Sequence, residues 1–216
     1  MGARLARWAP LSGIAFVVLW IVAFGLSLAQ EPGTADAEVV AHYTDPGNQG
    51  RAQMASFLMV LAGLLFLWFL TVLRARLARA EGKAGVHTTL AFGAGLVSSA
   101  LWVMASVFWM GVGYTAQETP EFTVDPDSAR LIGEMAYLIW VFGTVVALLL
   151  VLATSLLGLE TGLVPRWFAW IGLLVAAAML LTALFVGFFI FLGWLVVLSI
   201  VLIVRGEPAA LSRTGS

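Results

Sequence analysis

Glu134 is the ionisable residue whose position says most about possible chemistry, because it lies about one turn inside a long apolar stretch. Ionisable side chains inside a membrane segment are costly and are usually paired or functional. One interpretation is an ion pair with Arg130, which lies four residues earlier on the same helical face. The alternative is a proton or cation site at the mouth of a pocket. We favour the ion pair, because water lies close to the end of a span.

Four further candidates lie close in sequence to a predicted membrane boundary: Arg51, Arg130, His42 and Asp45. Arg51 and Arg130 both fall on the acidic side of the membrane, against the charge bias described below. We hypothesise that one or both pair with Glu134 or Asp45 and so close the outer ends of two spans. His42 lies close to Asp45 and is either a pH-sensitive outer site or a surface histidine on a short helix. The surface histidine is the more ordinary role.

The sequence lacks the residues that most catalytic or cofactor chemistry needs. It has no cysteine, which excludes disulfides, thiolate nucleophiles and iron–sulfur clusters. Its two histidines fall on opposite predicted sides of the membrane, so they do not converge on one metal. No GxSxG or P-loop pattern is present. The sequence therefore predicts no metal and no cofactor, and it weighs against enzyme chemistry inside the membrane. A net charge of −1 gives no basic patch for nucleic acid.

Tryptophans form a second group of candidates. Several of the nine lie near the predicted membrane boundaries, as an aromatic belt requires. Trp20, Trp102 and Trp194 are expected to lie deeper. They either fill the core, face lipid or line an apolar cavity that could hold a ligand.

Apolar segments of membrane-spanning length must position these side chains. Residues 167–204 contain no Asp, Glu, Lys or Arg. As one α-helix they would extend about 57 Å, at about 1.5 Å per residue. The hydrocarbon core of a bilayer is about 30 Å thick and is crossed by about 20 residues. The stretch therefore predicts two spans that turn near Gly187 and Phe188.

Composition extends this interpretation to the whole chain. Of its 216 residues, 62% are hydrophobic and 11% are charged, against about 25% charged in soluble domains. We predict an all-α transmembrane bundle with one domain, residues 1–216. The six spans are expected at about 9–30, 53–73, 87–114, 131–157, 167–186 and 188–204. Ala91, Gly95 and Ser99 repeat every four residues, which predicts close helix packing.

Two connecting features complete the layout. A short amphipathic helix is expected at the membrane surface within residues 31–50, followed by a turn at Asp45-Pro46-Gly47-Asn48. His87 is expected to help cap the third span. The first apolar run fits a cleaved signal peptide ending at Ser27-Leu28-Ala29, but its length favours a retained span.

The basic residues predict the orientation of the chain. Nine of the eleven Lys and Arg residues lie on one side of a six-span layout, and only Arg51 and Arg130 lie on the other. The positive-inside rule assigns the side with nine to the cytoplasm. The sequence thus predicts a multi-pass protein of the cell membrane with both termini in the cytoplasm.

Several short motifs along the chain are similar to those of a known protein family. They are Ala9-Pro10-Leu11-Ser12-Gly13, Glu38-Val39-Val40-Ala41-His42-Tyr43, Arg51, Phe66-Leu67-Trp68-Phe69-Leu70 and Leu163-Val164-Pro165-Arg166-Trp167. With these motifs the chain resembles a family of uncharacterised six-span integral membrane proteins of high-GC Gram-positive bacteria. The resemblance implies the six-span layout and carries over no functional residues.

The sequence favours non-enzymatic binding of a lipid or other small apolar ligand, or of a partner membrane protein. One alternative is a small transporter or channel subunit that uses Glu134. Another is a membrane enzyme that acts on lipid head groups through acids in the outer loops. The expected partners are membrane lipids, a second membrane protein or further copies of this chain.

Overall fold

The computed structural model describes residues 8–28, 35–82, 85–184 and 186–205, which contain helices and turns and no strand. The long helices are α4 (Pro46–Ala80), α5 (Val86–Glu118) and α6 (Pro126–Thr161). The shorter ones are α2 (Leu11–Leu28), α3 (Asp36–Thr44), α7 (Arg166–Ala178), the 3₁₀ helix η1 (Met179–Leu184) and α8 (Val186–Arg205). The all-α prediction is confirmed.

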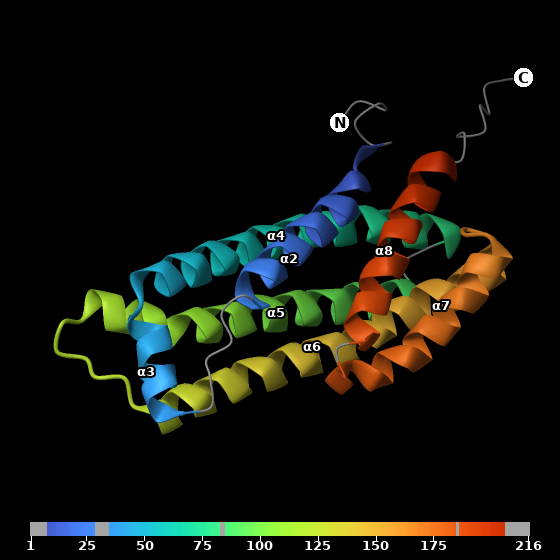
Figure 1. The fold of residues 1–216 in the computed structure, drawn as a ribbon. Helices are drawn as coiled ribbons and strands as arrows, with labels where there is room; N and C mark the ends of the chain where they lie inside the picture. The colour runs from blue at the N-terminus through green and yellow to red at the C-terminus, as the bar shows by residue number, and fades with distance from the viewer. Residues whose placement is uncertain (1–7, 29–34, 83–84, 185, 206–216) are drawn as a thin grey trace, which may run out of the picture.

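The helices form a closed ring. Figure 1 shows α4, α5 and α6 side by side along the length of the molecule. α7 packs against α6, α8 packs against α7 and η1, and α2 lies between α8 and α4. Of the described helices, only α3 stands outside this ring, because it lies across the far ends of α4, α5 and α6.

Two arginines bring several helix ends together at one end of the ring. Arg205 Nη1 donates to the carbonyl oxygens of Gly162 at 2.8 Å and Leu163 at 3.3 Å. Arg76, near the end of α4, donates to the carbonyl oxygen of Leu202. The ends of α4, α6 and α8 therefore meet here, and we call this the arginine end. The opposite end, covered by α3, is the cap end.

The long helices exceed the thickness of a membrane. They contain 35, 33 and 36 residues and are each about 50 Å long, against about 30 Å for a hydrocarbon core. The helices α4, α5, α6 and α8 are long and apolar enough to cross a membrane, while α2 and Arg166–Leu181 are shorter apolar helices. The surplus length of α4, α5 and α6 reaches the cap end, where α3 packs on it (Figure 1).

The cap end has a small core of its own. Val39 of α3 is buried with Val112, Val124 and Ala129, which belong to α5, the α5–α6 connection and α6. The predicted short helix is thus confirmed. The turn expected at Asp45-Pro46-Gly47-Asn48 is wrong, because Asp45 alone separates α3 from α4 and Pro46 already occupies the first turn of α4, a position where proline needs no N–H.

The apolar stretch 167–204 breaks into two helical segments, as predicted. The break is not at Gly187 and Phe188, because both lie inside α8. Instead η1 ends at Leu184 and α8 begins at Val186. The chain therefore returns to the arginine end, where Arg205 contacts the connection that precedes α7.

The stripe of small residues on α5 packs closely, as predicted. Ala91, Gly95 and Ser99 are buried. A Cβ on Gly95 would lie 2.5 Å from Leu70 Cδ2 of α4, and Ser99 Oγ donates to the carbonyl oxygen of Gly63 at 3.4 Å. Without a side chain at position 95, the two backbones approach closely enough to make these contacts.

Candidate functional site

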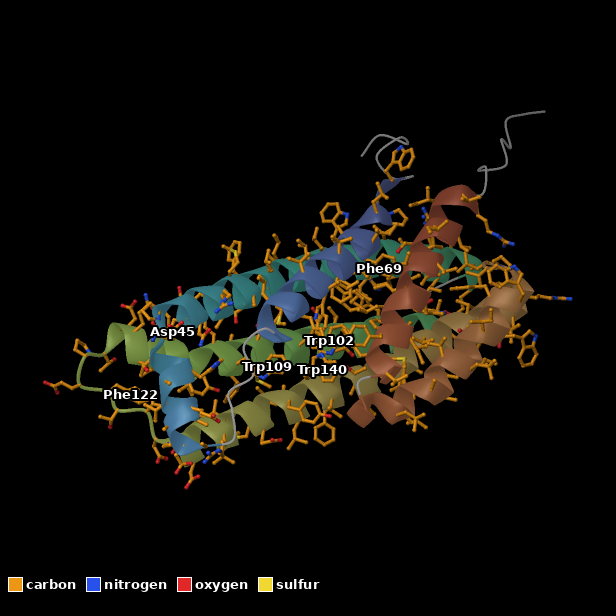
Figure 2. The ribbon with its side chains drawn as sticks, in the orientation of Figure 1. Asp45, Phe69, Trp102, Trp109, Phe122 and Trp140 are labelled. Carbon is orange, nitrogen blue, oxygen red and sulfur yellow. The ribbon has the colours of Figure 1, made fainter. Side chains whose placement is uncertain are left out.

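The interior of the ring is filled by ten aromatic side chains, which we call the aromatic core. Every element of the ring except η1 contributes at least one. The members, each with 5% exposure or less, are Phe16, Trp20, Phe66, Phe69, Trp102, Trp140, Phe168, Phe188, Phe191 and Trp194. Figure 2 shows Phe69, Trp102 and Trp140 directed into the space between the helices. A ring of six helices leaves room on its axis, and large planar side chains are well suited to fill it.

Phe188 lies at the centre of this core. Its side chain is fully buried. Its ring centroid lies 4.3 Å from that of Trp20, 5.1 Å from Trp140 and 5.4 Å from Trp102. These rings come from α2, α6 and α5, so the first turn of α8 links three helices that are far apart in sequence.

The three tryptophans predicted to lie deep are all members of the aromatic core. Trp20 and Trp102 both contact Phe188, and Trp194 stacks on Phe168 with centroids 5.9 Å apart. The Trp102 indole N–H donates to Thr144 Oγ1 at 3.2 Å. The structure therefore gives all three the packing role, the first of the roles considered from the sequence.

A polar cluster occupies the corner between α3 and α4. Asp45 Oδ1 accepts from the backbone N–H of Asn48 at 2.8 Å and so caps α4. The Asn48 amide also lies 3.4 Å from His42 Nδ1, and its oxygen accepts from Arg51 at 2.9 Å. Burial lowers the pKa of His42, and the Arg51 charge lowers it further against the opposing effect of Asp45. This keeps the imidazole neutral near pH 7.

The sequence-based pairing of Arg51 is wrong. Its guanidinium binds Asn48 and the carbonyl oxygen of Gly47, at 3.3 Å, and forms no ion pair with Asp45 or Glu134. The reason is local: Asp45 already serves as the helix cap, and Asn48 lies one turn before Arg51 on the same face.

The predicted pair between Arg130 and Glu134 is wrong too. Arg130 Nη2 lies 2.7 Å from Asp36 Oδ1 of α3, and Nη1 lies 3.0 Å from Asp127 Oδ1. These carboxylates raise the pKa of Arg130. Arg130 therefore ties α3 to the start of α6, where α3 brings in a carboxylate that helical spacing cannot reveal.

Glu134 is exposed on α6. Among the described residues none forms an ion pair or hydrogen bond with it. Because it is exposed, Glu134 is not part of the buried aromatic core. The structure thus brings His42, Asp45 and Arg51 together around Asn48 and joins Arg130 to α3. Among the described residues it gives Glu134 no ion pair with either group.

Glu81 is not among the candidates predicted from the sequence, yet among the described residues at the arginine end it is the carboxylate with the most hydrogen bonds. It accepts from the backbone N–H groups of Gly85 at 3.1 Å, His87 at 3.2 Å and Thr88 at 3.2 Å. The Thr88 hydroxyl donates to it at 2.6 Å. These bonds, led by the Thr88 hydroxyl, lower the pKa of Glu81 to about 2.

The cap of α5 is therefore Glu81 and not His87. Three of the four donors are N–H groups at the helix start, which are unsatisfied within a helix and favour an anion. His87 instead places Nδ1 3.4 Å from Glu81 and Nε2 4.0 Å from Glu160 of α6. The sequence signal for this cap is an acidic residue, Glu81, a few positions before the start of α5.

We expect the folded protein to lose stability below about pH 4.5, because the pKa of Glu81 falls from 4.5 to about 2 on folding. The carboxylate stabilises the fold above pH 4.5, and this contribution is lost progressively as the pH falls toward 2. Unfolding midpoints in detergent, measured from pH 2.5 to 7, should fall less steeply in Glu81→Gln than in the unsubstituted protein. Glu121→Gln, at an exposed carboxylate far from this cluster in the α5–α6 connection, is the control. Identical pH profiles for Glu81→Gln and the unsubstituted protein would contradict this role.

Within the ranges described, no group of three His, Asp or Glu residues could hold a metal ion. No protein-family model, curated protein or solved structure matches the chain. The site is therefore interpreted from its own geometry.

Proposed function

We propose that this chain is a six-span integral membrane protein of the cell membrane that binds a lipid or other small apolar ligand, or a partner membrane protein, without enzymatic activity. In this proposal α2, α4, α5, α6, α7 with η1, and α8 are the spans, and both termini are cytoplasmic. The resemblance to six-span membrane proteins of high-GC Gram-positive bacteria stays part of the proposal.

The meeting of helix ends at the arginine end supports this topology. Arg76, Arg79, Arg166 and Arg205 all belong to this end, as the positive-inside rule requires for a cytoplasmic face. α7 with η1 contains 13 and 6 residues, which extend about 30 Å together. That length suits a single crossing.

The aromatic core is the observation that favours binding over transport. Ten buried rings close the axis of the ring, and Glu134 lies outside it. A permeating ion would need to displace these rings and would meet few charges on the way. The lipid-facing surface and the cap end are left as the surfaces at which a ligand or partner can bind.

Flux through reconstituted liposomes tests this proposal. Proton flux reported by an entrapped pH dye, and potassium flux, should equal those of empty liposomes for both the unsubstituted protein and Glu134→Gln. Gramicidin supplies the positive control. A flux that depends on the protein and disappears in Glu134→Gln would overturn the proposal and establish a transporter or channel subunit that uses this carboxylate.

A further inference from the structure

Arg74 differs from the other arginines in where its charge lies. It is six residues before the end of α4 at Ala80, which places it about 9 Å in from the helix end. Its side chain is exposed, and its guanidinium carbon lies 5.0 Å from the centroid of the Phe92 ring on α5. A cation is therefore held on the outer surface of the ring, between α4 and α5.

Within the part of the chain that the structure describes, no anion balances this cation. Arg76 and Arg205 bind backbone carbonyl oxygens, and Arg130 binds two carboxylates. Among the described residues none offers Arg74 a carboxylate or carbonyl oxygen, so its contact is the face of Phe92. At the edge of a hydrocarbon layer an arginine needs a counter-ion or access to the head groups, and lipid phosphates lie at that level.

The surface beyond Arg74 suits an acyl chain. Helical spacing places Thr71 and Leu64 on the lipid-facing side of α4 next to α5, and Leu96 follows Phe92 by four residues on α5. Leu64 is 59% exposed and Leu96 is 40% exposed. From Arg74 toward Leu64 the chain moves about 15 Å away from the arginine end. Along this face of α4 and α5 the charge of Arg74 is therefore followed by apolar surface, just as the head group of a lipid is followed by its acyl chain.

We propose that Arg74 binds the phosphate of an acidic phospholipid from the leaflet at the arginine end, with an acyl chain lying between α4 and α5. This inference rests on the proposed function, and it names the lipid class and the place of binding. The planar guanidinium offers two parallel N–H groups to a phosphate, while Phe92 fixes its orientation. A bound acidic lipid joins α4 and α5 on their outer side.

Native mass spectrometry of the full chain in detergent, with added phosphatidylglycerol or phosphatidylcholine, tests this site. We expect one phosphatidylglycerol to bind more tightly than phosphatidylcholine. Arg74→Gln should weaken that binding about tenfold, as expected for loss of a charge-assisted contact. Arg74→Lys, which keeps the charge but loses the planar fork, should give an intermediate loss. Arg166→Gln removes an exposed arginine elsewhere at the arginine end and should leave binding unchanged.

Several outcomes would overturn this site. They are equal binding of the two lipids, an unchanged affinity in Arg74→Gln, or an equal loss in Arg166→Gln, which would show unspecific attraction to positive charge. Competition by inorganic phosphate as strong as by the lipid would show a free-phosphate site instead. Ion flux in liposomes would overturn the proposed function and leave the Arg74 result standing, so the two failures are distinguishable.

Discussion

Replacing Phe188 by alanine should lower the free energy of unfolding by about 3–5 kcal/mol, the cost of removing a large side chain from a packed core. The ring is fully buried and contacts Trp20, Trp102 and Trp140. Removing this ring leaves a cavity between α2, α5 and α6, which cannot all move inward to fill it. Unfolding by SDS in mixed micelles, followed by tryptophan fluorescence, would measure the change and would also report the altered surroundings of these three indoles.

Phe189 provides a matched control. It is the next residue on α8, it has the same side chain, and it is 42% exposed. Phe189→Ala removes edge contacts with Phe24, at 5.5 Å between centroids, and with Phe188, at 6.4 Å, and it should cost much less than Phe188→Ala. If both substitutions cost the same, Phe188 would not be at the centre of the core and the inward face of α8 would be wrong.

The features that the sequence predicted well are those carried by local patterns. The return of residues 167–204 follows from their length without charge, and the stripe on α5 follows from a four-residue repeat of small side chains. Helix content follows from composition and hydropathy. Each of these depends on neighbours within a few turns, which a single sequence displays directly.

The features that it predicted wrongly depend on contacts between distant segments. Arg130 binds Asp36, which lies 94 residues away, because α3 crosses the ends of the long helices. Helical spacing predicts Glu134 as the partner of Arg130, because the two residues are four apart. In the structure Asp36 and Asp127 are better placed, so Arg130 pairs with them instead. The positive charges of Arg76 and Arg205 predict the topology but not their contacts, because both bind carbonyl oxygens of other segments.

The aromatic core lies between these two cases. The depth of Trp20, Trp102 and Trp194 could be predicted from their distance to the span ends. Their convergence could not, because it depends on the rotation of each helix about its axis. That rotation is set by contacts with all the neighbouring helices. Because lipid and core are both apolar, the sequence of a helix does not show clearly which of its faces points inward.

Gly172→Ala should lower the free energy of unfolding by about 1–3 kcal/mol, because it overfills the contact between α6, α7 and α8. A Cβ at this position would overlap Ser155 Oγ of α6 and would lie 3.1 Å from Trp194 Nε1 of α8. All three residues are buried, so α7 would have to move outward. SDS unfolding in mixed micelles would measure the loss. Gly193→Ala is the control, because no atom lies within 4 Å of its added Cβ.

Ser155→Ala tests the cause of that loss. The Ser155 hydroxyl is buried without a hydrogen-bond partner, so removing it alone should cost little. Combined with Gly172→Ala it should restore part of the lost stability, although the Ser155 Cβ would still lie 3.1 Å from the new methyl group. Losses that simply add would show that the hydroxyl does not obstruct the methyl group. A Gly172→Ala cost equal to that of Gly193→Ala would mean that α7 is not wedged between α6 and α8, and the ring would then be open on that side.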